Sequence, residues 1–117
     1  GNAWHKFQEM VHCQGGDASE LEKLGDLQRA PVIRDITAEH DGIIIAADAE
    51  TIGRCSVSMG AGRSKADDVI NPTVGFDQLI KVGSEVSTGD VLGRVHAANE
   101  AGVDHGERLL REAIRCE

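Results

Sequence analysis

The 117-residue sequence predicts an α+β fold in which short strands are flanked by helices. Apolar residues recur at helical spacing near both ends of the chain, whereas β-branched residues between them form short runs broken by Gly and Asp. The clearest run is 81–97, KVGSEVSTGDVLGRVHA, whose breaks at 83–84 and 88–90 suit tight turns. We interpret it as a compact β-hammerhead or barrel-like unit, and it contains no catalytic group.

Two helices are expected before residue 31. Residues 3–14 predict an amphipathic helix whose apolar face is formed by Trp4, Phe7, Met10 and Val11. The glycines at 15–16 should end it. Asp17 suits the N-cap of a second helix over 18–24, with Glu20 completing a capping-box-like pair. Residues 25–31 read as a connector, so the two helices are expected to belong to a neighbouring layer.

The next segments predict two strands and a helix. Residues 31–37 alternate loosely and suit a strand, residues 39–42 suit a turn, and residues 42–47 (GIIIAA) suit a buried strand. Asp48 is a suitable N-cap for the helix that follows. The apolar face of that helix would contain Ile52, Cys55 and Met59, and the glycines at 60 and 62 would stop it.

The second half of the chain predicts a loop, further strands and a closing helix. Residues 63–72 are polar, with Val69 and Ile70 expected to anchor the loop. Residues 74–82 predict a strand that leads into 81–97. Residues 99–102 turn the chain into a final helix, and the buried stripe of that helix is expected to contain Val103, Leu109, Leu110, Ala113 and Ile114.

Composition excludes several functions. A net charge of −8 argues against nucleic acid as a partner, and the few aromatic residues offer no base-stacking platform. No apolar run approaches the length of a membrane span, and no leader is expected. Because the sequence begins with Gly1, we expect a processed or trimmed product. Cys13, Cys55 and Cys116 are far apart, which favours free thiols in a reducing cytoplasm over a zinc site or disulfides.

Three groups of residues could carry chemistry, and each has a simpler interpretation. The GAGRSK segment at 60–65 resembles an anion-binding loop, but it follows a helix and so faces the negative end of the helix dipole. Helix termination is therefore favoured. Asp67 and Asp68 are expected to be solvated. The histidines are scattered and are expected at the surface or in local hydrogen bonds: His5, His12, His40, His96 and His105.

The stretch 81–97 also has the outline of a biotinyl or lipoyl carrier hairpin. Such a carrier needs a lysine at the tip of an exposed hairpin turn, and no lysine occurs between Lys23 and Lys65. Lys81 begins a strand instead. A carrier function is therefore disfavoured, although the geometry can be shared without the chemistry.

Three stretches together resemble the C-terminal part of the thymidine and pyrimidine-nucleoside phosphorylases. Residues 7–17 (FQEMVHCQGGD) resemble a family helix ending in Q-G-G-D. Residues 58–76 (SMGAGRSKADDVINPTVGF) resemble its M-G-x-G-R, D-x-I and V-G-F/I signature. Residues 81–97 match its V-G-x-x-V-x-x-G-x-x-L-x-x-I/V-H-A pattern. The resemblance covers about residues 3–97, and residues 103–114 fit the closing helix of the family loosely.

The resemblance implies reversible phosphorolysis, in which phosphate displaces the base of a pyrimidine nucleoside and gives a pentose 1-phosphate. It implies an all-α domain and a larger α/β domain that close over the substrates, usually in a cytoplasmic homodimer. Residues 1–30 would be a helical lead-in from the parent α/β domain, and residues 31–117 the C-terminal α/β-hammerhead domain. The partners of this chain would be the parent's N-terminal α and α/β domains, through which alone nucleoside and phosphate would be bound.

The catalytic motifs of the family are absent from this sequence. Neither its K-x-S-x-G-G-x-G-D phosphate loop nor its base-binding Arg, Ser and Lys has a counterpart. We therefore assign no catalytic, cofactor-binding or metal-binding residue, expect no cofactor, and predict a structural portion that is inactive alone. The faces of the first and last helices should be partly uncovered. Alternatives are a stand-alone hammerhead ligand-binding or interaction module, and a related phosphorylase of nucleoside monophosphates.

Overall fold

The computed structural model describes residues 1–23 and 29–117, and it confirms the α+β class. The helical elements are α1 (Asn2–Cys13), the 3₁₀ turn η1 (Ala18–Lys23), α3 (Ala49–Ser56), the π-helical turn η2 (Val57–Ala61) and α4 (Glu100–Ala113). The strands are β1 (Val32–Thr37), β2 (Gly42–Ala47), β3 (Gly75–Asp77), β4 (Glu85–Val86), β5 (Val91–Ala97) and β6 (Ile114–Cys116). Residue 24 of the second predicted helix and most of the predicted connector lie outside the described residues.

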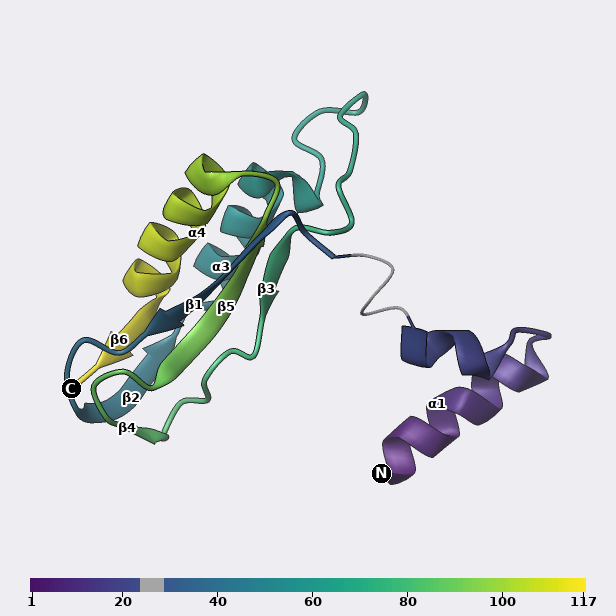
Figure 1. The fold of residues 1–117 in the computed structure, drawn as a ribbon, viewed down its shortest axis with the longest axis horizontal. Helices are drawn as coiled ribbons and strands as arrows, with labels where there is room; N and C mark the ends of the chain where they lie inside the picture. Colours follow the sequence, from purple (N-terminus) through teal and green to yellow (C-terminus); the bar gives the residue numbers. More distant parts are fainter. Residues whose placement is uncertain (24–28) are drawn as a thin grey trace.

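The strands form two small antiparallel sheets, ordered β1-β5-β3 and β4-β2-β6. The segment 81–97 contributes β4 to one sheet and β5 to the other, so the prediction of short strands in this segment is confirmed. Helices α3 and α4 lie side by side against one side of the strands (Figure 1). In the same view α1 and η1 lie apart from both sheets.

A β-bulge shapes the centre of the first sheet. The β1–β5 register shifts between Ile36 and Thr37, which pair with Gly93 and Val91. Leu92 is the extra residue, and both Leu92 and Gly93 are buried. A bulge places two consecutive side chains on the same side, which strict alternation forbids. It allows β5 to contribute Leu92 as well as Val95 to the core.

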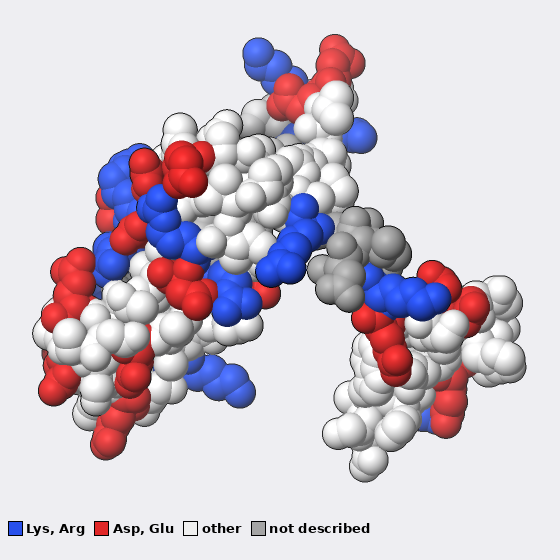
Figure 2. All heavy atoms as spheres, viewed as in Figure 1, with Lys and Arg blue, Asp and Glu red and all other residues white. Residues whose placement is uncertain are grey.

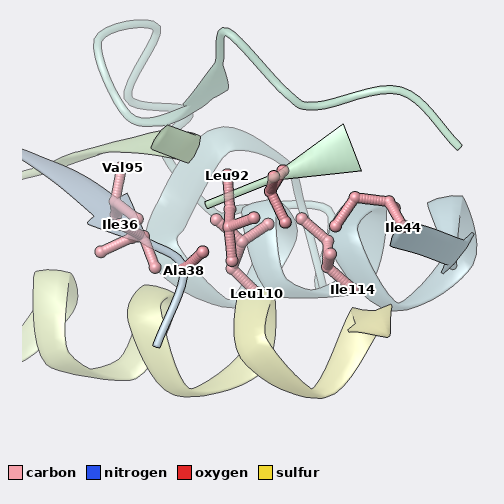
Figure 3. Close-up of a cluster of buried hydrophobic side chains, with 8 residues drawn as sticks. Ile36, Ala38, Ile44, Leu92, Val95, Leu110 and Ile114 are labelled. Carbon is pink, nitrogen blue, oxygen red and sulfur yellow. The ribbon is translucent and has the colours of Figure 1, made fainter. Parts of the chain in front are cut away.

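One apolar cluster lies between the sheets and α4 (Figure 3). Its buried members come from both sheets and from the last helix and strand: Ile36, Ala38, Ile44, Val86, Leu92, Val95, Leu110 and Ile114. Each Å² of apolar surface removed from water stabilises the folded state by about 25 cal/mol. The burial of this cluster is therefore the main favourable contribution to folding. The long-range strand pairs bring its members together, so the cluster also joins the two sheets.

The apolar run of β2 is only half buried. Ile44 is fully enclosed, but Ile43 and Ile45 are 47% and 39% exposed. The prediction of a buried strand was therefore wrong for these two residues. The reason is that only one face of the small sheet is covered, and successive side chains of a strand point to opposite faces.

The predicted anchors of the 63–72 loop are also wrong. Val69 is 90% exposed and Ile70 is exposed as well. Polar contacts hold the loop instead: Asp68 accepts hydrogen bonds from two backbone N–H groups, and Asn71 donates its own N–H to the carbonyl of Gly60 at 2.8 Å. The strand predicted over 74–82 shrinks to β3, because Gln78 takes a positive φ of 51°.

The ends of the chain differ from prediction in three respects. Residues 18–23 form a 3₁₀ turn, in which Asp17 bonds to Ser19 rather than pairing with Glu20 through a capping box. Ile114 belongs to β6, which pairs with β2 and was not predicted. The stripe of α4 is covered, since Val103 and Leu110 are essentially inaccessible. The expectation that the final helix would be partly uncovered is therefore wrong on that face.

Candidate functional site

Among residues 1–23 and 29–117, no group of three or more His, Cys, Asp or Glu side chains could hold a metal ion. The three cysteines are free, as predicted. Two histidines, His96 and His105, nevertheless have close polar neighbours that their positions in the sequence do not indicate. Each lies in a cluster of polar groups, a third cluster surrounds the glycines after α3, and a fourth surrounds Arg111.

Ser58 and His105 form a pair that superficially suggests nucleophilic catalysis. The Oγ of Ser58 lies 2.9 Å from Nε2 of His105, although the residues are 47 positions apart. On the other side of the ring, Nη2 of Arg108 lies 3.0 Å from Nδ1. A guanidinium can only donate hydrogen bonds, so Nδ1 must accept and the neutral ring carries its proton on Nε2.

That proton arrangement is the reverse of an activated serine. A general base needs a free lone pair on the ring nitrogen nearest the hydroxyl. Here Nε2–H donates to Ser58, and the hydroxyl of Ser58 donates to the carbonyl oxygen of Cys55 at 2.7 Å. The cluster ties η2 to α4 and supplies no nucleophile.

The outer face of the first sheet carries a row of charges. Asp35, Arg94 and Asp77 lie opposite one another on β1, β5 and β3, on the side away from α4. Nε of Arg94 donates to Asp35 at 2.6 Å, and this hydrogen bond lowers the pKa of Asp35 and raises that of Arg94. His96 places Nε2 3.0 Å from Oδ1 of Asp77, but the atoms are not aligned as a hydrogen bond. The row consists of neighbouring opposite charges, which favours a structural, solvated face.

The GAGRSK segment binds an anion that belongs to the same loop. Gly60 has a φ of 106° and ends the helical region, as predicted. The backbone N–H groups of Ser64 and Lys65 then donate to Oδ2 of Asp68 at 3.0 and 2.9 Å. The amides that could bind an external phosphate are therefore already occupied by a carboxylate. Asp68, expected to be only solvated, is the residue that organises this loop.

A small cavity of about 130 Å³ opens beside Arg111, between Leu92, Ile114 and Cys116. Of the residues that line this cavity, Arg111 is the one whose positive charge could bind an anion. Its guanidinium donates to Oε1 of Glu107 at 3.0 Å and to the carbonyl of Thr37 at 3.0 Å, and it lies near Glu39. Two carboxylates neutralise this cation, so the cavity offers little attraction to a phosphate.

The first helix keeps its apolar face uncovered, as predicted. None of the residues of α1 is buried. Trp4, Phe7 and Met10 are 42%, 46% and 52% exposed, and the rings of Trp4 and Phe7 contact each other at a centroid distance of 6.0 Å. Figure 2 shows an extended uncharged area over this helix.

An exposed apolar helix face of this kind is typical of a surface that contacts other protein. The comparison with known families agrees. The chain belongs to the family described as the pyrimidine nucleoside phosphorylase C-terminal domain, whose model matches residues 43–117. The resemblance seen in the sequence is thus confirmed.

Curated relatives extend the similarity to nearly the whole chain. The thymidine phosphorylase of Burkholderia orbicola is 35% identical over 112 residues, which is 95% of this chain and 26% of the relative. That of Colwellia psychrerythraea is 33% identical over 115 residues, 97% of this chain and 26% of the relative. That of Mesorhizobium japonicum is 38% identical over 102 residues. The chain therefore spans about a quarter of the length of the curated relatives it matches. None of the helices in the described ranges could cross a membrane.

Proposed function

We propose that this chain is the C-terminal structural portion of a pyrimidine-nucleoside, or thymidine, phosphorylase. The parent reaction is reversible phosphorolysis of a nucleoside to a free base and a pentose 1-phosphate, a pentosyl transfer. The observation that supports the proposal is the family match over residues 43–117, together with thymidine phosphorylases that align with nearly the whole chain.

The role of the domain in that enzyme is to stabilise and frame the α/β domain. Residues 31–117 form the α/β-hammerhead unit, and residues 1–30 are the lead-in from the parent α/β domain. The polar clusters support a structural role, because Asp68, Arg94 and Arg111 each have partners within the chain. Nucleoside and phosphate are bound by the α and α/β domains of the parent, which works in the cytoplasm as a homodimer.

The chain alone lacks the phosphate loop and the base-binding Arg, Ser and Lys, so it turns over neither thymidine nor uridine. The decisive test uses a chimera in which the 115 aligned residues of the Colwellia thymidine phosphorylase are replaced by this chain. We expect phosphate-dependent release of thymine by the chimera and none by the 117-residue chain. A folded but inactive chimera would favour a stand-alone interaction module, and turnover by the isolated chain would refute the claim that it is inactive.

A further inference from the structure

The second sheet has one uncovered face. Each of its strands contributes one residue to the buried core: Ile44 of β2, Val86 of β4 and Ile114 of β6. Successive side chains of a strand point to opposite faces, so the residues next to these point away from the core. They include Ile43, Glu85 and Arg115, and all three are exposed. The sheet lies at the end of the domain that carries the C-terminus (Figure 1).

Apolar side chains occupy the middle of this outer face. Ile43 and Ile45 belong to β2, the central strand of the sheet, and both are exposed. Apolar surface that remains in water is unfavourable, and neighbouring exposed residues of this kind mark a surface that contacts other protein. The middle of the face would therefore gain from being covered.

Charges of opposite sign lie at opposite corners of the face. Glu85 is directly across from Ile43 on β4, and Arg115 is across from Ala46 on β6. The two corners are thus on different edge strands, and they are separated by about 10 Å along β2. Within the described ranges, 1–23 and 29–117, neither Glu85 nor Arg115 has an ion-pair partner.

The acidic corner is also hollow. An open depression of about 480 Å³ lies beside Ile43 and Glu85, and Ser87 and Asp90 also line it. Its apolar wall and its two carboxylates suit a long cationic side chain. Such a side chain packs its methylene stem on apolar surface and places its charged head beside an anion. Arg115 has these properties, but within one chain it lies at the other corner of the face.

A two-fold rotation of a second copy brings the complementary features together. In a two-fold interface both molecules use the same patch, so each contact occurs twice. An axis in the plane of the face, midway between Glu85 and Arg115, exchanges the two corners. Each Arg115 then lies opposite Glu85 of the other copy, and the isoleucines of β2 are covered between them. A different protein would need only one of the two corners, whereas a second copy matches both.

We propose that the outer face of the second sheet is a weak two-fold interface between copies of this chain. Three strands and the six residues of β2 give a face of about 14 by 20 Å, or roughly 300 Å². Stable complexes bury about 800 Å² on each partner, so this area belongs to the class of weak, transient contacts. Association therefore depends on protein concentration, and salt weakens it because ions screen the charges at the rim.

Charge exchange tests the interface. In sedimentation equilibrium, the mass of the 117-residue chain should rise from one copy towards two between about 10 µM and 1 mM. Arg115→Glu and Glu85→Arg should each weaken association about tenfold or more, because each places like charges together at both contacts. An equimolar mixture of the two variants should associate like the wild type, because two acidic corners then meet two basic ones. Arg63→Glu and Glu22→Arg change the net charge equally at other exposed positions and should have no effect.

Rescue by mixing distinguishes this face from the other exposed surfaces. A mass that stays at one copy up to about 1 mM would overturn the inference. Association that survives both single variants would also overturn it, and would place the contact elsewhere, for example on the uncovered face of α1. A mixture that fails to associate would show that net charge and not pairing is responsible. Should Arg115→Glu not fold, Arg115→Gln replaces it and must weaken association more than Arg63→Gln does. None of these experiments involves nucleoside turnover, so their failure would leave the proposed function unaffected.

Discussion

Gly106 of α4 lies directly against Val95 of β5. A Cβ at position 106 would come within 2.7 Å of Cγ1 of Val95, and within 3.2 Å of the sulfur of Met59. The helix reaches the sheet this closely only because residue 106 has no side chain. The contact lies within the α4–β5 interface, so the spacing of the two layers depends on it.

Gly106→Ala should therefore destabilise the domain, even though alanine favours helices more than glycine does. Val95 is fully buried and has no room to move, so overpacking should cost about 1–3 kcal/mol and outweigh the helix-propensity gain. Gly53→Ala is the control, since a Cβ on this α3 residue meets nothing within 4 Å. It should stabilise by up to about 1 kcal/mol. Urea unfolding of both variants measures the difference, and equal midpoints would contradict the close contact.

Local signals account for most of what the sequence predicted correctly. Asp48 accepts the Glu50 amide as a helix cap, and Gly60 ends the helical region, because both effects depend on neighbouring residues alone. The turn of 88–90 is confirmed for the same reason, with Gly89 at a φ of 95°. These features require no knowledge of the partner strands.

Long-range contacts account for the failures. β6 is only three residues long, and its strand conformation depends on pairing with β2, about 70 positions earlier in the chain. Ile43 and Ile45 are exposed because only the other face of β2 is covered. The apolar run GIIIAA does not indicate which face of the strand will be covered. The Ser58–His105 pair is equally invisible in the sequence, because it depends on how α4 packs beside η2. The family resemblance, by contrast, depends on short motifs and could be recognised.

The cap of α3 should give the domain a measurable pH dependence. Hydrogen bonds from the hydroxyl of Thr51 and the amide of Glu50 lower the pKa of Asp48. A folded-state pKa below the unfolded value of about 3.9 means that this stabilisation is complete above that pH and is lost as the pH falls through the folded-state value. Asp48→Asn keeps a good N-cap but cannot titrate. The difference in Tm between wild type and Asp48→Asn should shrink on acidification from pH 6 towards pH 2.5. If the two plots of Tm against pH ran parallel, the charge of the Asp48 carboxylate would contribute nothing to stability.

The cysteines should react in a fixed order with a thiol reagent such as DTNB. Cys13 is exposed on α1, whereas Cys55 is buried against α4, where loss of solvation raises the pKa of its thiol. The thiolate is the form that reacts with the reagent. Cys55 is therefore protected twice, because the reagent cannot reach the buried sulfur and because its thiol stays protonated. In a Cys116→Ser background, which removes the half-buried third thiol, the folded protein should release colour rapidly from Cys13 and from Cys55 only at the rate of unfolding. Cys13→Ser should remove the fast phase, and Cys55→Ser should remove the slow phase. If a fast phase survived in Cys13→Ser and disappeared in Cys55→Ser, the buried position of Cys55 in α3 would be wrong.

The Ser58–His105 pair should behave as a structural tie and not as a catalytic dyad. Because Arg108 can only donate to Nδ1, neutral His105 should carry its proton on Nε2, and ¹⁵N shifts of the ring should show a pyridine-like Nδ1. In an active chimera, Ser58→Ala should leave thymidine turnover unchanged, and a phosphonofluoridate should not label the protein. Arg108→Met frees Nδ1, so the tautomers should mix in that variant while activity is retained. Loss of turnover in Ser58→Ala, or covalent labelling of Ser58 in the wild type, would show that the hydroxyl is activated and would overturn the assignment.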